Sequence, residues 1–145
     1  MIAGRFHPGV WAHYGAGAPV TLHSYCMFDT RTVEEKAWQH DPWGAERTAM
    51  GPYPKVLVGR GAMGAKGPHV AWLNALAAIM AVEGALPVNI MFLAEGEEIL
   101  GSPTYRDFVA RYAERLQSVA ASFVPSMAQS PGGSCRSGSV SKAWW

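Results

Sequence analysis

Three glutamates stand close together after a long apolar run: Glu95, Glu97 and Glu98. The run, residues 88–94, predicts a buried strand, and open α/β sheets bind ligands beyond the carboxyl ends of such strands. Because side chains alternate along an extended chain, Glu97 and Glu98 should point to different sides. A carboxylate in a cleft can act as a general base, its pKa raised by burial or lowered by a nearby cation. The residues by themselves leave open a solvated turn before a helix, whose N-terminus favours negative charge.

The histidines form no metal-binding motif, because no two of them have helical or zinc-ligand spacing. His23 falls in an apolar stretch and is interpreted as a core histidine. Asp29 closes that stretch, where its carboxylate either orients a group in a cleft or caps a turn. The five histidines are His7, His13, His23, His40 and His69.

Three glycines, Gly59, Gly61 and Gly64, satisfy the G-x-G-x-x-G pattern of dinucleotide-binding folds. In such a fold the glycines let the backbone approach a pyrophosphate at a helix N-terminus. In such a fold an acidic residue ends the next strand about 20 positions later. Here the next strand ends near Glu95, which lies 31 positions after Gly64. A dinucleotide-binding module is therefore the weaker alternative.

These groups must be positioned by strands and helices that hydrophobic patterns predict. Residues 10–14 and 20–28 are expected to be strands, joined by the glycine-rich reversal "GAGAP". Residues 29–54 are expected to be irregular, and residues 55–58 a short strand.

The second half of the chain alternates strand and helix. Residues 69–84 carry one apolar stripe at helical spacing, and the apolar strand 88–94 follows. Ser102 fits an N-cap for a second helix over residues 105–116. This order predicts an α/β layer architecture with parallel neighbouring strands.

Composition indicates one globular domain and excludes several classes of partner. The chain has 145 residues, 49% hydrophobic and 16% charged, and a formal net charge of +1. No basic block favours nucleic acid or an anionic membrane, and no segment has the roughly 20 apolar residues of a membrane span. Arg5 and His7 interrupt any apolar leader. The two cysteines, Cys26 and Cys135, form no disulfide framework, which favours a reducing cytoplasm.

The composition changes abruptly near the C-terminus, which divides the chain into residues 1–128, a partial catalytic α/β domain, and an irregular tail, 129–145. The tail is rich in Gly and Ser and has no periodicity. One interpretation is a disordered terminus. The other is a shifted reading frame, because codons exist for Ser134 to Trp145 that encode "LPVRLGLEGMV" in another frame. The N-terminus also begins in strand-like sequence, as expected of a piece of a longer protein.

The stretch "GRGAMGAKGP", a helix, "LPVN" and "EGEEILGS" resemble in order and spacing the zinc exopeptidase family of aminoacylase, carnosine dipeptidase, acetylornithine deacetylase and succinyl-diaminopimelate desuccinylase. The resemblance covers residues 20–116. It implies an incomplete α/β catalytic domain with part of a mixed, mostly parallel sheet flanked by helices. The implied activity is cleavage of amide bonds in dipeptides or N-acyl amino acids. The family's dimer-forming domain has no counterpart in this sequence.

In that family two zinc ions share a bridging carboxylate and a water, and a glutamate takes the proton of that water. The glutamate base falls on Glu98, and the aspartate of the first metal-binding strand falls on Asp29. Three zinc-ligand positions fall on Met27, Gly64 and Ile99, whose side chains are unsuitable donors for zinc. The resemblance thus implies catalytic roles for Glu98 and Asp29. It also implies zinc, which these residues would not hold in the usual way, and a catalytically inactive remnant or binding module is the alternative.

Overall fold

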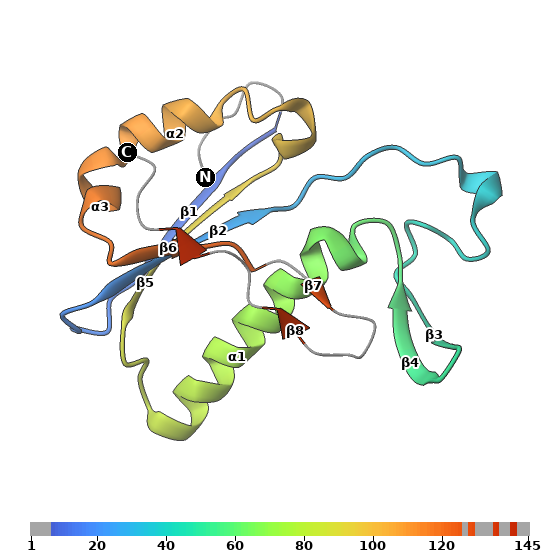
Figure 1. Cartoon of the computed structure of the whole chain (residues 1–145), viewed down its shortest axis with the longest axis horizontal. Helices are drawn as coiled ribbons and strands as arrows, with labels where there is room; N and C mark the ends of the chain where they lie inside the picture. The colour runs from blue at the N-terminus through green and yellow to red at the C-terminus, as the bar shows by residue number, and fades with distance from the viewer. Residues whose placement is uncertain (1–6, 126–127, 130–134, 137–139, 142–145) are drawn as a thin grey trace.

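A five-stranded mixed sheet forms the centre of the molecule (Figure 1). The computed structural model describes residues 7–125, 128–129, 135–136 and 140–141. The strand order is β1-β5-β2-β6-β9, in which β5, β2 and β6 are parallel and the outer strands β1 and β9 are antiparallel to their neighbours. The strands are β1 (Val10–Tyr14), β2 (Thr21–Met27), β5 (Asn89–Glu95), β6 (Ala121–Phe123) and β9 (Val140–Ser141).

Strand β5 lies inside the sheet and is buried along most of its length, as its apolar run predicts. Leu93 is 1% exposed, and burying one such side chain stabilises the fold by about 1.5–3 kcal/mol. The register of β5 with β2 places Met27 opposite Glu95 at the carboxyl ends of both strands. The residues that the sequence singled out therefore begin at one edge of the sheet.

Helices cover both faces of this sheet (Figure 1). The helix α1 (Gly67–Glu83) lies on one face, where Trp72 meets Phe123 of β6 edge to face. The helices α2 (Tyr105–Arg111) and α3 (Ala113–Gln117) lie on the other, where Tyr112 stacks on Trp11 of β1. The α/β architecture with parallel inner strands is thus confirmed.

The reversal between β1 and β2 is present, but the two strands are not neighbours. Strand β5 lies between them, and the side chain of Asn89 at its start fastens the loop. Its Oδ1 accepts hydrogen bonds from the N–H groups of Ala16 (2.8 Å) and Ala18 (3.2 Å). Its Nδ2 donates to the carbonyl of Ala18 (2.7 Å) and to Thr21 Oγ1 (3.1 Å). A residue 68 to 73 positions away thus supplies the contacts that close the turn.

The prediction of irregular chain over residues 29–54 is wrong in its last part. Residues Glu46–Met50 form β3, which pairs antiparallel with β4 (Tyr53–Val58) across a turn at Gly51, where φ is +54°. The prolines at 52 and 54 obscure the strand pattern, although an edge position tolerates them. A short 3₁₀ turn at Glu35–Ala37 precedes the hairpin.

The second helix differs from its prediction at both its start and its middle. Thr104, and not Ser102, occupies the N-cap position, and Ser102 has a φ of +54°. The helical region is also broken at Tyr112 into α2 and α3. The hydroxyl of Ser102 donates instead to Oε1 of Glu95.

The tail contains short paired segments within its described residues. The strand β7 (Ala128–Gln129) pairs with β8 (Cys135–Arg136), and β9 pairs with β6. Most of the remaining tail lies outside the described residues, so the domain boundary at 128 and the shifted reading frame stay predictions. Among the described helices, none is long and apolar enough to cross a membrane.

Candidate active site

Glu95 ends β5 as a buried carboxylate, 2% exposed. Its Oε1 accepts hydrogen bonds from the hydroxyl of Tyr25 and from Ser102 Oγ (2.9 Å). Burial raises the pKa of Glu95, and the nearby charges of Asp29 and Glu98 raise it further, although the two hydroxyl donors act in the opposite direction. Burial and the bond to Glu95 also raise the pKa of Tyr25, so its hydroxyl stays a donor.

Glu97 is equally buried and fastens the loop after β5. Its Oε1 accepts the N–H of His7 (2.9 Å) and its Oε2 accepts the N–H of Thr104 (3.2 Å). Its carbonyl accepts the N–H groups of Leu100 (3.0 Å) and Ser102 (2.8 Å). The expectation that neighbouring glutamates face different sides is confirmed, because Glu97 is 2% exposed whereas Glu98 is exposed.

Glu98 and Ile99 lie in a 3₁₀ turn, Glu98–Leu100, that faces solvent. The backbone N–H of Ile99 donates to Asp29 Oδ2 at 2.8 Å. Asp29 follows β2, so this bond joins the ends of two parallel strands and brings Asp29 beside the residue that follows Glu98. The other oxygen of Asp29, Oδ1, is buried and has no hydrogen-bond partner among the described residues. The structure thus places Asp29 against the backbone of Ile99, the residue that follows Glu98, while the catalytic roles of Asp29 and Glu98 stay predictions.

Met27 ends β2, and its backbone N–H donates to Nε2 of His69 at 3.1 Å. The bond requires a lone pair on Nε2, so in the neutral ring Nδ1 carries the proton. Burial lowers the pKa of His69, which favours that neutral form. Sequence spacing could not find this contact, because the two residues are 42 positions apart and belong to different elements.

Gly64 lies in an irregular helical turn, Ala62–Lys66, where its φ of −128° and ψ of 96° are open to any residue. A Cβ built on Gly64 would meet no atom within 4 Å. The position therefore has room for a larger side chain. Ile99, at another of the three positions, is 40% exposed.

No metal site can be assembled from the described residues, since no three His, Cys, Asp or Glu side chains converge. Cys26 packs as a free buried thiol, and burial raises its pKa to about 11. His23 is buried in the core, with Nδ1 at 3.1 Å from Ser122 Oγ. Neither residue is available for chemistry at the strand ends.

The chain matches known peptidases in sequence over most of its length. It is 35% identical over 102 residues to Beta-Ala-His dipeptidase of Homo sapiens, covering 70% of this chain and 20% of that protein. It is 31% identical over 110 residues to the Cys-Gly metallodipeptidase dug1 of Schizosaccharomyces pombe, covering 74% of this chain and 22% of that protein. No family model matches. The chain therefore spans about a fifth of the curated relatives it matches.

Solved structures agree with the sequence matches. An M20 family metallo-carboxypeptidase from Sulfolobus solfataricus superposes with a TM-score of 0.75 at 27% identity, over 88% of this chain and 28% of that one. Human carnosine dipeptidase 1 superposes with a TM-score of 0.66 at 31% identity, over 81% and 24% of the two chains. The chain is homologous to M20 metallopeptidases. The resemblance to the zinc exopeptidase family is confirmed, and the mixed α/β sheet is the fold segment shared with M20 structures.

Proposed function

We propose that this chain is part of the catalytic domain of an M20-type hydrolase that cleaves amide bonds in dipeptides or N-acyl amino acids. The observation that carries the proposal is the bond between Asp29 Oδ2 and the N–H of Ile99, which positions Glu98 at the meeting point of two strand ends. The names of the relatives, a Beta-Ala-His dipeptidase and a Cys-Gly metallodipeptidase, support dipeptides as the substrate class.

Glu98 is the proton acceptor in this proposal. Its side chain is exposed, while the turn that carries it is held by Asp29 and by the backbone carbonyl of Glu97, which accepts the N–H of Leu100. A general base in such a position contributes about 10²- to 10⁴-fold to a rate. Asp29 acts as a positioning residue, since it contacts the backbone of the turn.

Zinc, which the M20 family implies, does not fit the residues at three family ligand positions. Met27 offers a thioether, Gly64 no side chain and Ile99 a hydrocarbon, whereas zinc is bound by thiolate, imidazole and carboxylate. The N–H of Ile99 further occupies Asp29 Oδ2. We therefore propose that this chain has lost the usual zinc site, and no step is assigned to the metal.

A second candidate function, a catalytically inactive binding module, is favoured by the same three residues. The dinucleotide-binding alternative is weakened by the fold. The strand before Gly59, Gly61 and Gly64 is β4, which pairs with β3 in a separate two-stranded sheet, whereas a dinucleotide fold needs it in the parallel sheet. The cytoplasmic location and the absence of nucleic-acid and membrane partners stay predictions.

Dipeptide hydrolysis separates the two candidates, and zinc content tests the proposed loss of the zinc site. The purified chain is assayed with β-alanylhistidine, cysteinylglycine and an N-acetyl amino acid, and its zinc is measured by elemental analysis. For a hydrolase, Glu98→Gln should lower kcat by about 100-fold or more with little change in KM. Glu114→Gln, on the exposed surface of α3, is the matched control.

Each outcome has a distinct meaning. Unchanged turnover in Glu98→Gln removes Glu98 from the mechanism. Absence of hydrolysis with every substrate supports the inactive module. Stoichiometric zinc in the unaltered chain contradicts the proposed loss of the site.

A further inference from the structure

A hollow whose lining includes neither Asp29 nor Glu98 lies between the β3–β4 hairpin and the start of α1. Its volume is about 430 Å³, within the range of small-molecule pockets. Most of its wall is apolar, and its lining includes Pro42, Trp43, Leu57, Arg60, Lys66 and Val70. We propose that this hollow, named here the hairpin pocket, binds a small carboxylate that carries an aromatic or alkyl group.

The apolar wall exposes large side chains that a folded domain usually covers. Trp43 is 53% exposed, Leu57 57% and Val70 54%, and they come from three separate segments of the chain. Their convergence on one hollow provides apolar surface that a ring or alkyl chain would cover.

The indole of Trp43 is held in place although it is exposed. Its Nε1 donates to Glu35 Oε1 at 2.7 Å, and its backbone N–H donates to Asp41 Oδ1 at 2.8 Å. The segment is tied to the pocket wall by the N–H of Arg60, which donates to the carbonyl of Pro42 at 2.6 Å. A wall fixed in advance binds with less loss of conformational entropy.

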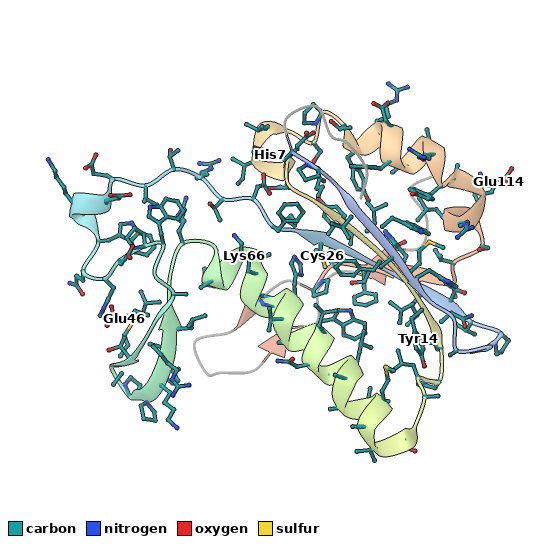
Figure 2. All side chains as sticks on the ribbon, turned by 180° about the vertical axis from the view of Figure 1, so that it is seen from behind. His7, Tyr14, Cys26, Glu46, Lys66 and Glu114 are labelled. Carbon is teal, nitrogen blue, oxygen red and sulfur yellow. The ribbon has the colours of Figure 1, made fainter. Side chains whose placement is uncertain are left out.

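Two cations of the lining, Arg60 and Lys66, supply charge for an anion. Within the part of the chain that the structure describes, neither forms an ion pair, and the Arg60 side chain donates from Nε to the carbonyl of Arg31 (3.1 Å). Figure 2 shows Lys66 at the start of α1, the end of the helix whose dipole favours anions. Both residues line the hairpin pocket, so each offers a positive charge to a carboxylate bound there.

The nearby acidic groups already have partners. Glu35 and Asp41 accept the bonds from Trp43, and Glu46 Oε2 pairs with His40 Nδ1 at 2.9 Å. None of these three carboxylates lines the hairpin pocket. The charge that a ligand meets inside the pocket is therefore positive.

Calorimetric titration of the chain with 3-phenylpropionate tests the proposal, with 3-phenylpropanamide and acetate as probes of charge and ring. We expect the aromatic carboxylate to bind at least about tenfold more tightly than either analogue. Lys66→Gln should weaken its binding about fivefold, whereas Lys55→Gln, an exposed lysine of β4 outside the pocket lining, should leave it unchanged. Trp43→Ala should weaken the binding of the carboxylate and of the amide alike.

Equal affinity for the carboxylate and the amide overturns the proposal. So does equal weakening by Lys66→Gln and Lys55→Gln, which indicates attraction by net charge alone, or no binding by a chain whose circular dichroism shows it folded. None of these results bears on the proposed hydrolase, because the hairpin pocket contains neither Asp29 nor Glu98.

Discussion

The carboxylate of Asp29 accepts a hydrogen bond from the backbone N–H of Ile99 at 2.8 Å, joining the ends of β2 and β5. The partners lie 70 positions apart in the chain. The exposed turn that carries Glu98 is therefore held by a strand to which it is not adjacent in sequence.

Removing this carboxylate should loosen the turn. We expect Asp29→Ala to lower the free energy of unfolding by about 1–2 kcal/mol, because a hydrogen bond to a charged acceptor is lost. Asp29→Asn keeps an oxygen acceptor and removes a negative charge that acts on Glu95. It should therefore lower the free energy of unfolding by less than Asp29→Ala does. Urea unfolding measures both. A larger loss in Asp29→Asn than in Asp29→Ala would contradict the role of the hydrogen bond.

Restoring three ligand types should restore metal binding. The triple variant Met27→His, Gly64→Asp, Ile99→Glu should bind about one zinc ion per chain after dialysis, because three protein ligands suffice in catalytic zinc sites. The open space at Gly64 accommodates the aspartate. Elemental analysis is the measurement, and each single variant is a control expected to bind little zinc. A triple variant without zinc would show that the three positions do not converge.

Asn89 should be among the most sensitive polar positions outside the core. Its side chain makes four hydrogen bonds that close the loop between β1 and β2. Asn89→Ala should therefore destabilise the chain by about 2–3 kcal/mol in urea unfolding. Asn74→Ala, an exposed position on α1, should change stability by less than about 0.5 kcal/mol. Similar losses in both variants would contradict this role.

Buried His23 should make stability depend on pH. Burial lowers its pKa from 6.5 to about 4, so between these values the unfolded chain binds the proton that the folded chain excludes. The stabilising effect of neutral His23 is complete above about pH 6.5 and is lost as the pH falls toward 4, by up to about 3 kcal/mol. When urea unfolding is measured from pH 7.5 to 5, the free energy of unfolding should fall less steeply with falling pH in His23→Gln than in the unaltered chain. The pKa of His69 is also lowered, so part of the slope should remain, and an unchanged slope would exclude His23 as its source.

The apolar surface of α1 should promote self-association. Val82 is 80% exposed and Val70 54%, on a helix with no Lys, Arg or Asp after Lys66. Val82→Lys should lower light scattering of concentrated solutions and change stability by less than about 0.5 kcal/mol. Val82→Leu, which keeps the apolar surface, is the control. Equal scattering by the two variants would show that the chain associates through a surface other than that of Val82.

Local pattern determined much of this protein from sequence alone. The apolar run before Glu95 predicted β5, the stripe after Pro68 predicted α1, and the order and spacing of the Gly-rich and Glu-rich segments indicated the resemblance to zinc exopeptidases. Such signals depend on residues within one element, where side-chain period and burial are coupled. They also identified Glu98 and Asp29 as candidates.

The tertiary structure alone decided the contacts between distant segments. It placed β5 between β1 and β2 and paired β3 with β4. It also formed the hydrogen bond from the Ser102 hydroxyl to Glu95 and the one from the Met27 N–H to His69. These partners are set by strand order and by competition among buried polar groups, which each need a partner once water is excluded. No local pattern encodes that competition, because its outcome depends on which elements meet.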